Sequence, residues 1–525
     1  MLFSLPRHVA FADEAYYIML AKNLVEGKGY TYYAGLPELH FPPLFPLVLA
    51  VLHAVVPSWE IVTRVAYVLF GTILPLPIYL LGRDMYGFRI GMLAGLLAAV
   101  MPAFTSSILF DESLCEPLYL VCLFSGIHQV FRAWQRARCV HYGVAGCFFS
   151  LAYLTRPEGF LYVLVALAFM SCVEWRRRHT PVSVRLGRLA GLLGAFLAIA
   201  SPYLVYLRLN TGEWALTTKS TTSYTTTRGL VYHDRVTFLH DTDGLDANGE
   251  MRFFAQHRNE SLAGLLLGPY RVRVLPDIAT NLRTAYHLLI KPYFFGRYLA
   301  ILAILGFVGT PWTRKRFARE AFNIAITITL CPVFLYFISD RLLYGILLPL
   351  TLWAACGIDR VFIWIEQSEF PWRLGSEYAR WGMKAIFCVA LFGVLSRAGY
   401  TYFFHKSGER AHVWPTVEWV KNNLPPEAVL MSNSAEVALH SGRGWIPLPV
   451  ASTRDVIDFG LKRKATHLCL QACFSDGRPD QKRELFTEAR DFEGMSLVIK
   501  VDDAAACAHF AIYRLNPGPR SAQDL

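Results

Sequence analysis

The chain has 525 residues, of which 54% are hydrophobic, 14% are aromatic and only 17% are charged. A soluble protein carries about 25% charged residues, so this composition is typical of a protein with several membrane-spanning helices. It excludes a disordered chain, a collagen-like fibre and a small disulfide-stabilised scaffold.

The net charge of +11 is unevenly distributed along the chain. From residue 405 onward, 15 basic residues balance 15 acidic ones, whereas residues 1–404 hold 36 basic and 25 acidic residues. The excess therefore lies among the apolar stretches, as expected for charges that set membrane topology. This pattern argues against a nucleic-acid-binding surface.

Ten apolar stretches are candidates for membrane-spanning helices, which need about 20 residues each. The shorter ones require helix tilt or flanking aromatic residues to complete the crossing. In chain order the stretches are 62–82, 90–110, 114–132, 140–155, 159–174, 189–207, 297–312, 321–338, 343–365 and 383–404.

Alternate connections between these stretches are basic, and the positive-inside rule places basic connections in the cytoplasm. The other short connections contain almost no Lys or Arg beyond two isolated arginines, Arg156 and Arg341. Residues 1–60, the turns near 111–116, 156–158 and 339–341, the long loop 208–296 and the tail are therefore expected outside. The basic groups are Arg83/Arg89, Arg132/Arg136/Arg138, Arg176/Arg177/Arg178/Arg185/Arg188, Arg314/Lys315/Arg316/Arg319 and Arg373/Arg380/Lys384.

No apolar stretch before residue 60 is long enough to bring the first outer loop across the membrane. Leu44–Trp59 is short and follows Pro42-Pro43, so an interfacial or re-entrant helix is expected there. We therefore expect a first transmembrane helix that precedes Met1.

The tail, residues 405–525, is predicted to form a small α/β domain. A helix is expected at Trp414–Leu424, and strands at Ala428–Met431, Thr466–Leu470, Ser496–Val501 and His509–Leu515. No strand is followed by a nucleotide-binding glycine pattern. Most of the 11 cysteines fall in apolar stretches, where they are expected to be small buried side chains. Cys469 and Cys473 are the one pair that could form a disulfide.

Two acidic groups are candidates for chemistry. Asp13-Glu14 also fits the solvated first turn of a helix, where carboxylates are favoured. Asp111 and Glu112 fit a loop, but Glu116 falls within a predicted membrane helix. A charge there costs roughly 2.5–3.5 kcal/mol, so Glu116 is interpreted as a site residue.

Three short segments add cations and an imidazole on the same outer face. Arg156-Pro157-Glu158 and Asp340-Arg341 place arginines where the topology rule would remove them. Snorkelling explains these arginines as well as phosphate binding does. Glu38 and His40 precede a proline turn, and His40 taken alone also fits a structural role.

The topology is derived from the basic loops alone and makes no use of these charged groups. Their gathering on one membrane face is therefore independent support for a site there. A carboxylate can take the proton of an acceptor hydroxyl. Arginines can neutralise a departing phosphate. The pattern therefore indicates transfer of a group from a lipid phosphate at the outer membrane surface.

The order of five motifs resembles the GT-C superfamily of integral-membrane glycosyltransferases, over roughly residues 8–404. The branch it resembles holds bacterial relatives of the dolichyl-phosphate-mannose–protein mannosyltransferases, which include the lipid A aminoarabinose transferase. The motifs are the first-loop Asp13-Glu14, His-Phe-Pro-Pro-Leu-Phe-Pro-Leu from His40, Glu-Pro-Leu-Tyr from Glu116, Leu-Thr-Arg-Pro-Glu-Gly around Arg156, and Asp-Arg-Leu-Leu-Tyr-Gly-Ile-Leu-Leu-Pro from Asp340.

The resemblance implies a polyprenyl-phosphate sugar donor and a single displacement with inversion at the anomeric carbon. It makes Asp13 the general base, beside Glu14. It makes Glu116, with Asp111 as runner-up, the acid that orients the acceptor or a divalent cation, and the metal question stays open. The donor phosphate would be bound by Arg341, with Arg156 and His40, and neighbouring carboxylates Glu38 and Glu158 would complete the substrate site.

The sequence therefore predicts a mainly α membrane bundle, residues 1–404, with an outer α/β domain, residues 405–525. The expected protein is a glycosyltransferase of the bacterial plasma membrane whose acceptor is a protein, lipid or glycan. A transporter or lipid flippase is the main alternative, although no two matching halves are visible. A catalytically silent scaffold of the cell envelope is a third interpretation.

Overall fold

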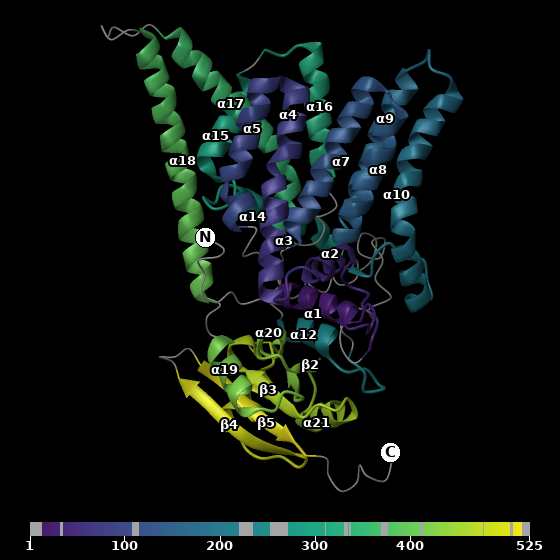
Figure 1. Ribbon diagram of the computed structural model, residues 1–525, viewed down its shortest axis with the longest axis vertical. Coiled ribbons are helices and arrows are strands. Elements are labelled where there is room, and N and C mark those ends of the chain that lie inside the picture. The colour runs from purple at the N-terminus through teal and green to yellow at the C-terminus, as the bar shows by residue number, and fades with distance from the viewer. Residues whose placement is uncertain are drawn as a thin grey trace.

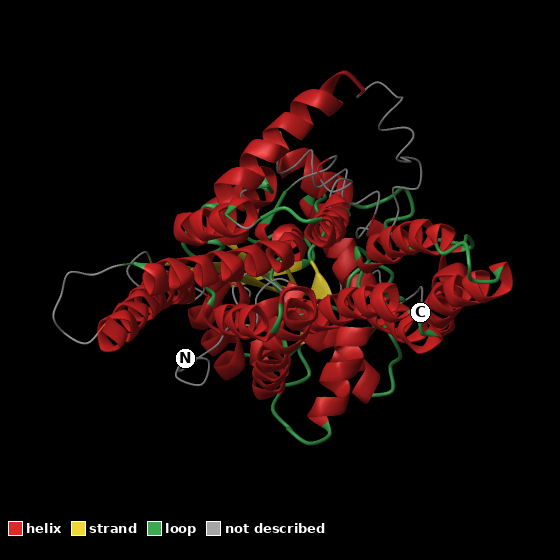
Figure 2. Cartoon of the chain, turned by 90° about the horizontal axis from the view of Figure 1, so that it is seen from above, coloured by secondary structure: helices red, strands yellow, loops and turns green. Residues whose placement is uncertain are grey.

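In the computed structural model, a bundle of long helices stands over a small sheet domain (Figure 1). Seen along the bundle, the sheet lies behind its middle (Figure 2). The structure describes residues 13–31, 35–107, 115–219, 235–251, 271–309, 311–329, 334, 338–368, 376–409, 413–475, 477–503 and 508–516.

The helices of the bundle and its outer loops follow the apolar pattern of the sequence. In chain order they are α1 (Asp13–Val25), α2 (Leu44–His53), α3 (Trp59–Ile73), α4 (Pro75–Tyr86), α5 (Phe88–Val100), the π-helical turn η2 (Ala103–Ser107), α7 (Glu116–Arg136), α8 (Cys139–Thr155), α9 (Gly159–Arg176), α10 (Val182–Thr211), α12 (Arg235–Asp243), α14 (Arg271–Leu289), α15 (Gly296–Val308), α16 (Arg314–Ile328), the 3₁₀ helix η4 (Asp340–Ile346), α17 (Leu347–Gln367) and α18 (Ser376–Glu409).

Each of the ten predicted membrane stretches forms helix over most of the residues that the structure describes in it, and the chain is a multi-pass membrane protein. Among the described residues, five helical segments are long and apolar enough to cross a bilayer by themselves: 59–86, 159–176, 182–211, 340–367 and 377–402. Two stretches are less regular than expected. The first bends at Leu74-Pro75 between α3 and α4, and the second leaves helical geometry at Met101 before η2.

The basic connections all lie at the end of the bundle far from the sheet domain (Figure 1). There they pair with acids on the helix ends. Asp84 of α4 accepts from His128 of α7 at 2.9 Å, and Arg89 lies 2.8 Å from Asp359 of α17. Glu174 of α9 is buried against Arg188 of α10 at 3.1 Å. The charge pattern that predicted topology therefore marks one end of the bundle.

Small residues let neighbouring helices approach closely. A Cβ added at Gly306 of α15 would lie 1.9 Å from the carbonyl oxygen of Trp353 in α17. A Cβ at Gly357 of α17 would meet the carbonyl of Leu302 at the same separation. Only glycine fits this crossing, which suits helix association in a membrane, where packing replaces the hydrophobic effect.

The tail forms the expected α/β domain around one sheet with strand order β2-β1-β3-β5-β4. β1 pairs in parallel with β2 and β3, whereas β5 is antiparallel to β3 and β4. The elements are α19 (Trp414–Asn423), β1 (Val429–Ser432), α20 (Ala435–Ser441), β2 (Gly444–Pro447), α21 (Thr453–Lys462), β3 (His467–Gln471), the 3₁₀ turn η6 (Ala472–Phe474), α22 (Pro479–Lys482), the π-helical turn η7 (Arg483–Glu488), β4 (Met495–Asp503) and β5 (Ala508–Leu515).

Two details of the domain differ from the sequence interpretation. The edge strand β2 was not predicted, because Gly444-Trp-Ile-Pro447 is short and is bounded by residues that normally interrupt strands. The open disulfide pairing is not formed: Cys469 is a buried thiol on β3, Cys473 is an exposed thiol, and no disulfide joins them.

The interfacial helix expected after Pro42-Pro43 is α2, which ends at His53. Together with α1 it lies between the bundle and the sheet domain (Figure 1). Both helices pack on the bundle through buried side chains, among them Tyr17 and Leu20 of α1 and Phe45 and Leu49 of α2. This layer brings the first acidic motif of the sequence over the ends of the bundle helices.

Candidate active site

Asp13 is the first residue of α1, and its partner comes from the far end of the bundle sequence. Arg341 Nη1 of η4 donates to Asp13 Oδ2 at 2.7 Å. The side chains are 28% and 23% exposed, so the pair is accessible but shielded. The structure thus joins two residues that the sequence could only place on one membrane face.

A second ion cluster forms where α7, α8 and α9 meet. Glu116, the first residue of α7, is fully buried, and its Oε1 accepts from Arg156 Nη1. Arg156 ends α8, and its Nη2 also donates to Glu158 Oε1 at 3.1 Å. Burial would raise the pKa of Glu158, but Arg156 opposes it and lowers this pKa to about 2. Glu116 is therefore a compensated buried charge, as buried charges must be.

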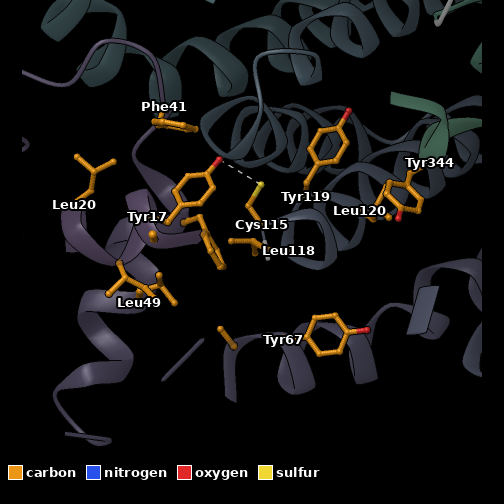
Figure 3. Packing of buried hydrophobic residues seen from close by; sticks show 14 of the residues in the cluster. Tyr17, Leu20, Phe41, Leu49, Tyr67, Cys115, Leu118, Tyr119, Leu120 and Tyr344 are labelled. Carbon is orange, nitrogen blue, oxygen red and sulfur yellow. Dashed lines mark hydrogen bonds between the residues drawn. The ribbon is translucent and has the colours of Figure 1, made fainter. Parts of the chain in front are cut away.

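The two clusters are joined through a cysteine that the sequence interpretation did not single out. Tyr17 of α1 donates its hydroxyl to Cys115 Sγ at 3.4 Å (Figure 3). Cys115 Sγ in turn donates to Glu116 Oε2 at 3.6 Å. Because Arg156 holds the other oxygen, the Glu116 carboxylate is fixed from both sides, and α1 is tied to α7 at the same point.

Glu38 and His40 lie in the loop that leads to α2. Glu38 is 2% exposed, and its Oε1 accepts from the backbone N–H of His40 at 2.5 Å and of Phe41 at 2.9 Å. Burial raises the pKa of Glu38 to about 7 despite these bonds. Burial, helped by Lys219 and Arg341, lowers the pKa of His40. The Glu38 carboxylate therefore holds the turn that places His40 beside the cations.

Lys219 is a site residue that sequence reasoning missed. The start of the long outer loop is fastened to the bundle, since Tyr153 donates to the carbonyl of Leu216 at 2.6 Å and Thr218 donates to that of Leu39 at 2.6 Å. This brings Lys219 Nζ to 4.8 Å from the Phe41 ring centre. Only its position in a Thr/Ser-rich outer segment, Thr217–Thr227, could have drawn attention to it.

The electrostatics of Lys219 show which groups face it. Burial lowers its pKa, Asp13 and Glu158 raise it, and Arg156 and Arg341 lower it. Lys219 is therefore close to both ion clusters. Three cations from three separate segments surround one small region at the outer helix ends.

The remaining predicted residues are less informative. Glu14 is 2% exposed in the first turn of α1, beside Asp13. Asp111 and Glu112 lie outside the described residues. Among the residues that the structure describes, no group of three His, Cys, Asp or Glu side chains could hold a metal ion. Asp13, Glu116 and Glu158 pair with arginines.

A polar pocket lies between the clusters. It shares Tyr162 and Thr329 with a second, apolar pocket between α7, α9 and α16. The polar pocket is lined by Tyr119, Arg156, Glu158, Leu161, Tyr162, Thr329, Arg341, Leu342 and Gly345. The apolar one is lined by Ile127, Val130, Phe149, Tyr162, Val165, Ala166, Phe169, Phe322, Ala325, Ile326 and Thr329.

This arrangement suits an amphipathic anion. A phosphate fits beside the arginines and the lysine, and an attached hydrocarbon chain fits among the aliphatic and aromatic side chains of the adjoining pocket. A carboxylate within the same region can accept a proton from an attacking hydroxyl.

Residues 40–206 match the family model of the dolichyl-phosphate-mannose-protein mannosyltransferases. No curated protein sequence matches the chain.

Several solved structures share the fold and are distant in sequence. ArnT from Cupriavidus metallidurans bound to undecaprenyl phosphate has a TM-score of 0.55 and 13% identity, covering 97% of this chain and 94% of its own. The Archaeoglobus fulgidus oligosaccharyltransferase in complex with Zn and sulfate has a TM-score of 0.57 and 13% identity, and the alignment covers 96% of this chain and 76% of that protein. AglB from the same organism, with an inhibitory peptide and a dolichol-phosphate, has a TM-score of 0.52 and 14% identity, and the alignment covers 90% of this chain and 67% of that protein.

The family match over residues 40–206 and the fold shared with ArnT and the oligosaccharyltransferase support the resemblance to GT-C glycosyltransferases that the sequence predicted. The expected fold, a helical bundle followed by a small sheet domain, is confirmed. The match to the mannosyltransferase model spans α2 to α10, and so includes Glu116, Arg156 and Glu158.

Proposed function

We propose that the protein transfers a sugar from a polyprenyl-phosphate donor to an acceptor hydroxyl at the extracytoplasmic face of a bacterial plasma membrane. The observation that carries the proposal is the meeting of Asp13, Arg341, Arg156 and Lys219 beside a polar pocket. Arg156 and Arg341 line this pocket, which shares Tyr162 and Thr329 with an apolar one. The opposite, basic end of the bundle is then cytoplasmic by the positive-inside rule.

In the proposed reaction Asp13 takes the proton from the acceptor hydroxyl as its oxygen bonds to the anomeric carbon. The bond between that carbon and the phosphate oxygen breaks, and its electron pair leaves with the polyprenyl phosphate. Arg341, Arg156 and Lys219 neutralise the charge that develops on the phosphate. One displacement on the face opposite the phosphate inverts the anomeric configuration.

The paired pockets support the proposed donor class. A polyprenyl phosphate has a single anionic head and a long hydrocarbon chain, and a polar and an apolar pocket lie side by side. The structure of ArnT is bound to undecaprenyl phosphate and that of AglB is in complex with a dolichol-phosphate, which also supports this donor class for a chain of the same fold. The acceptor class is not indicated by the pockets and is left as protein, lipid or glycan.

The location of the ion clusters favours an enzyme over a transporter. A transported substrate is usually bound near the bilayer midplane between two repeats. Asp13, Glu116, Arg156 and Arg341 instead gather at the outer ends of helices, under the layer formed by α1 and α2.

The test is transfer by purified protein from a panel of radiolabelled polyprenyl-phosphate sugars to envelope extracts. We expect wild type to transfer at least one sugar, and Asp13→Asn to lose about 10²–10⁴-fold in turnover, the usual contribution of a general base. Glu26→Gln, a carboxylate just beyond the end of the same helix, is the matched control and should keep full turnover.

Binding of undecaprenyl phosphate is measured separately. Asp13→Asn should still bind it, whereas Lys219→Gln should bind it about tenfold more weakly, and Lys28→Gln on the same outer layer should not. No transfer from any donor by wild type would reject the proposed function and favour a lipid transporter. Equal turnover in wild type and Asp13→Asn would keep a transferase and reject Asp13 as its base.

A further inference from the structure

Three separate parts of the chain meet beside the helix that carries Asp13. Tyr16 of α1 stacks obliquely on Trp445 of β2, with ring centres 5.9 Å apart. Trp445 is 7% exposed, so the contact is buried. The third part is the end of α12 in the long outer loop, where Asp243 lies against the sheet domain.

Arg478 of the sheet domain connects these parts. Its Nη2 donates to Asp243 Oδ2 at 2.9 Å, and its Nη1 donates to the carbonyl of Leu448 at 2.7 Å, one residue beyond β2. The carbonyl of Asp243 accepts from the backbone N–H of Val450 at 2.8 Å. Arg478 thus fixes the outer loop to the segment that follows Trp445.

Arg478 is also close to α1. The guanidinium is 5% exposed, and burial lowers its pKa, while nearby Asp243 and Tyr16 oppose that shift. A buried guanidinium loses its main compensation if Asp243 is removed. The junction of Tyr16, Trp445, Arg478 and Asp243 is therefore a single packed and charged unit.

The position of α1 is defined from two sides. On the bundle side, Tyr17 packs edge-on against Phe45 of α2 with ring centres 5.1 Å apart and binds Cys115. On the other side, Tyr16 rests on the sheet domain. Asp13 is three residues from Tyr16, and residues at this spacing lie on the same helix surface about 5–6 Å apart.

We propose that the C-terminal sheet domain positions the catalytic helix, with Arg478 and Trp445 as positioning residues for Asp13. This inference rests on the proposed function of Asp13. The sheet domain holds α1 in place through Tyr16, and the Arg478–Asp243 pair locks β2 and the outer loop around that contact. Loss of the junction leaves the donor site intact but lets Asp13 leave its reactive position, and small misplacements of a catalytic group reduce turnover strongly.

The chain contains its own matched control. Glu250 of the same outer loop pairs with the sheet domain through Lys462 of α21 at 2.9 Å and through the adjacent Arg463. This pair joins the same two parts of the protein at a different element from the one that faces Tyr16. A purely structural role of the domain predicts a loss of folded protein that scales with the burial of each pair, and no change in kcat per folded molecule from either variant.

The experiment compares Arg478→Gln and Glu250→Gln in the full-length protein in detergent or lipid nanodiscs. We expect Arg478→Gln to lower kcat at least tenfold while Kd for undecaprenyl phosphate changes less than twofold. Glu250→Gln should change neither by more than twofold. Hydrogen exchange of the α1 backbone amides, followed by mass spectrometry, should rise in Arg478→Gln alone.

If Arg478→Gln does not fold, Tyr16→Leu and Trp445→Leu decide the question. Each should lower kcat, and the double variant should be no worse than either single one, because both remove the same contact. Trp445→Phe, which keeps an aromatic ring, should retain most turnover.

Equal kcat and equal α1 exchange in Arg478→Gln and Glu250→Gln would overturn the positioning role. So would additive losses in the Tyr16 and Trp445 variants. Failure of the proposed function is a different result, namely no transfer by wild type, and the exchange measurement still tests the junction in that case.

Discussion

Removal of Arg156 should destabilise the protein far more than removal of either of its acidic partners. Arg156 is 11% exposed and contacts two carboxylates, Glu116 at 1% and Glu158 at 28% exposure. Arg156→Gln leaves both acids without their cation. Glu116→Gln, in contrast, leaves Arg156 still paired with Glu158.

The magnitudes follow from burial. Removing one partner of a buried ion pair costs about 3–5 kcal/mol, because the remaining charge is uncompensated. We expect Arg156→Gln to fall in that range, since Glu116 is almost fully buried. Glu116→Gln removes one charge-assisted hydrogen bond and leaves a paired arginine, which should cost about 1.5–3 kcal/mol. Glu158→Gln should cost less, since water reaches its side chain.

The assay is unfolding by sodium dodecyl sulfate in mixed micelles, followed by tryptophan fluorescence, for the three single variants and for Glu116→Gln/Arg156→Gln. The double variant should cost clearly less than the sum of the two single ones, with a coupling of about 1–3 kcal/mol, because these residues are in contact. Equal losses for Arg156→Gln and Glu116→Gln, or an additive double variant, would refute the view that Arg156 compensates a buried Glu116.

Three further predictions concern other parts of the chain. C115A should lower turnover about fivefold to tenfold with unchanged lipid-phosphate binding, because Glu116 loses one orienting hydrogen bond of about 1–1.5 kcal/mol. The turnover of C115S should lie between those of wild type and C115A. Unchanged turnover in C115A would contradict the prediction. The folded-state pKa of Glu38 is raised from 4.5 to about 7, so its contribution to stability is complete below pH 4.5 and is lost as the pH rises through about 7. E38Q should therefore remove about 3 kcal/mol of pH dependence between pH 4.5 and 8, measured by unfolding at both values, and parallel profiles would contradict it. G306A should destabilise the protein by about 1–3 kcal/mol or more in the same assay, since its Cβ meets a backbone oxygen, whereas G143A has open space and should be neutral or stabilising.

Much of the fold could be predicted because hydropathy constrains it strongly. Every apolar stretch of sufficient length became helix, since a lipid environment requires backbone hydrogen bonds to be satisfied within the segment. The alternate basic connections, such as those around Arg83 and Arg177, fall at one end of the bundle because the chain reverses at each crossing. The strand β2 was not predicted because Gly444 and Pro447 normally interrupt strands, and because the strand forms through its pairing with β1.

For the candidate site, the sequence predicted only that its residues lie on the same membrane face, not which of them are in contact. Asp13, Glu116, Arg156 and Arg341 were chosen as charges that an apolar environment would otherwise remove, and the structure brings each into an ion pair. Their catalytic and substrate-binding roles stay predictions. Lys219 escaped attention because a lysine in a polar outer loop carries no energetic signal in the sequence.

The sequence by itself determined the class of this protein: a multi-pass bundle, the end of the bundle that carries the basic connections, a sheet domain after it, and the opposite end, at which the isolated charged residues gather. Those features depend on hydrophobicity and charge along the chain, which are local properties. Only the tertiary structure decided the partners. It paired Asp13 with Arg341 across 328 positions of sequence, inserted Cys115 between Tyr17 and Glu116, and placed Trp445 against α1. Such contacts depend on how the helices rotate and pack against one another, and the apolar pattern of a lipid-embedded helix leaves that rotation undetermined.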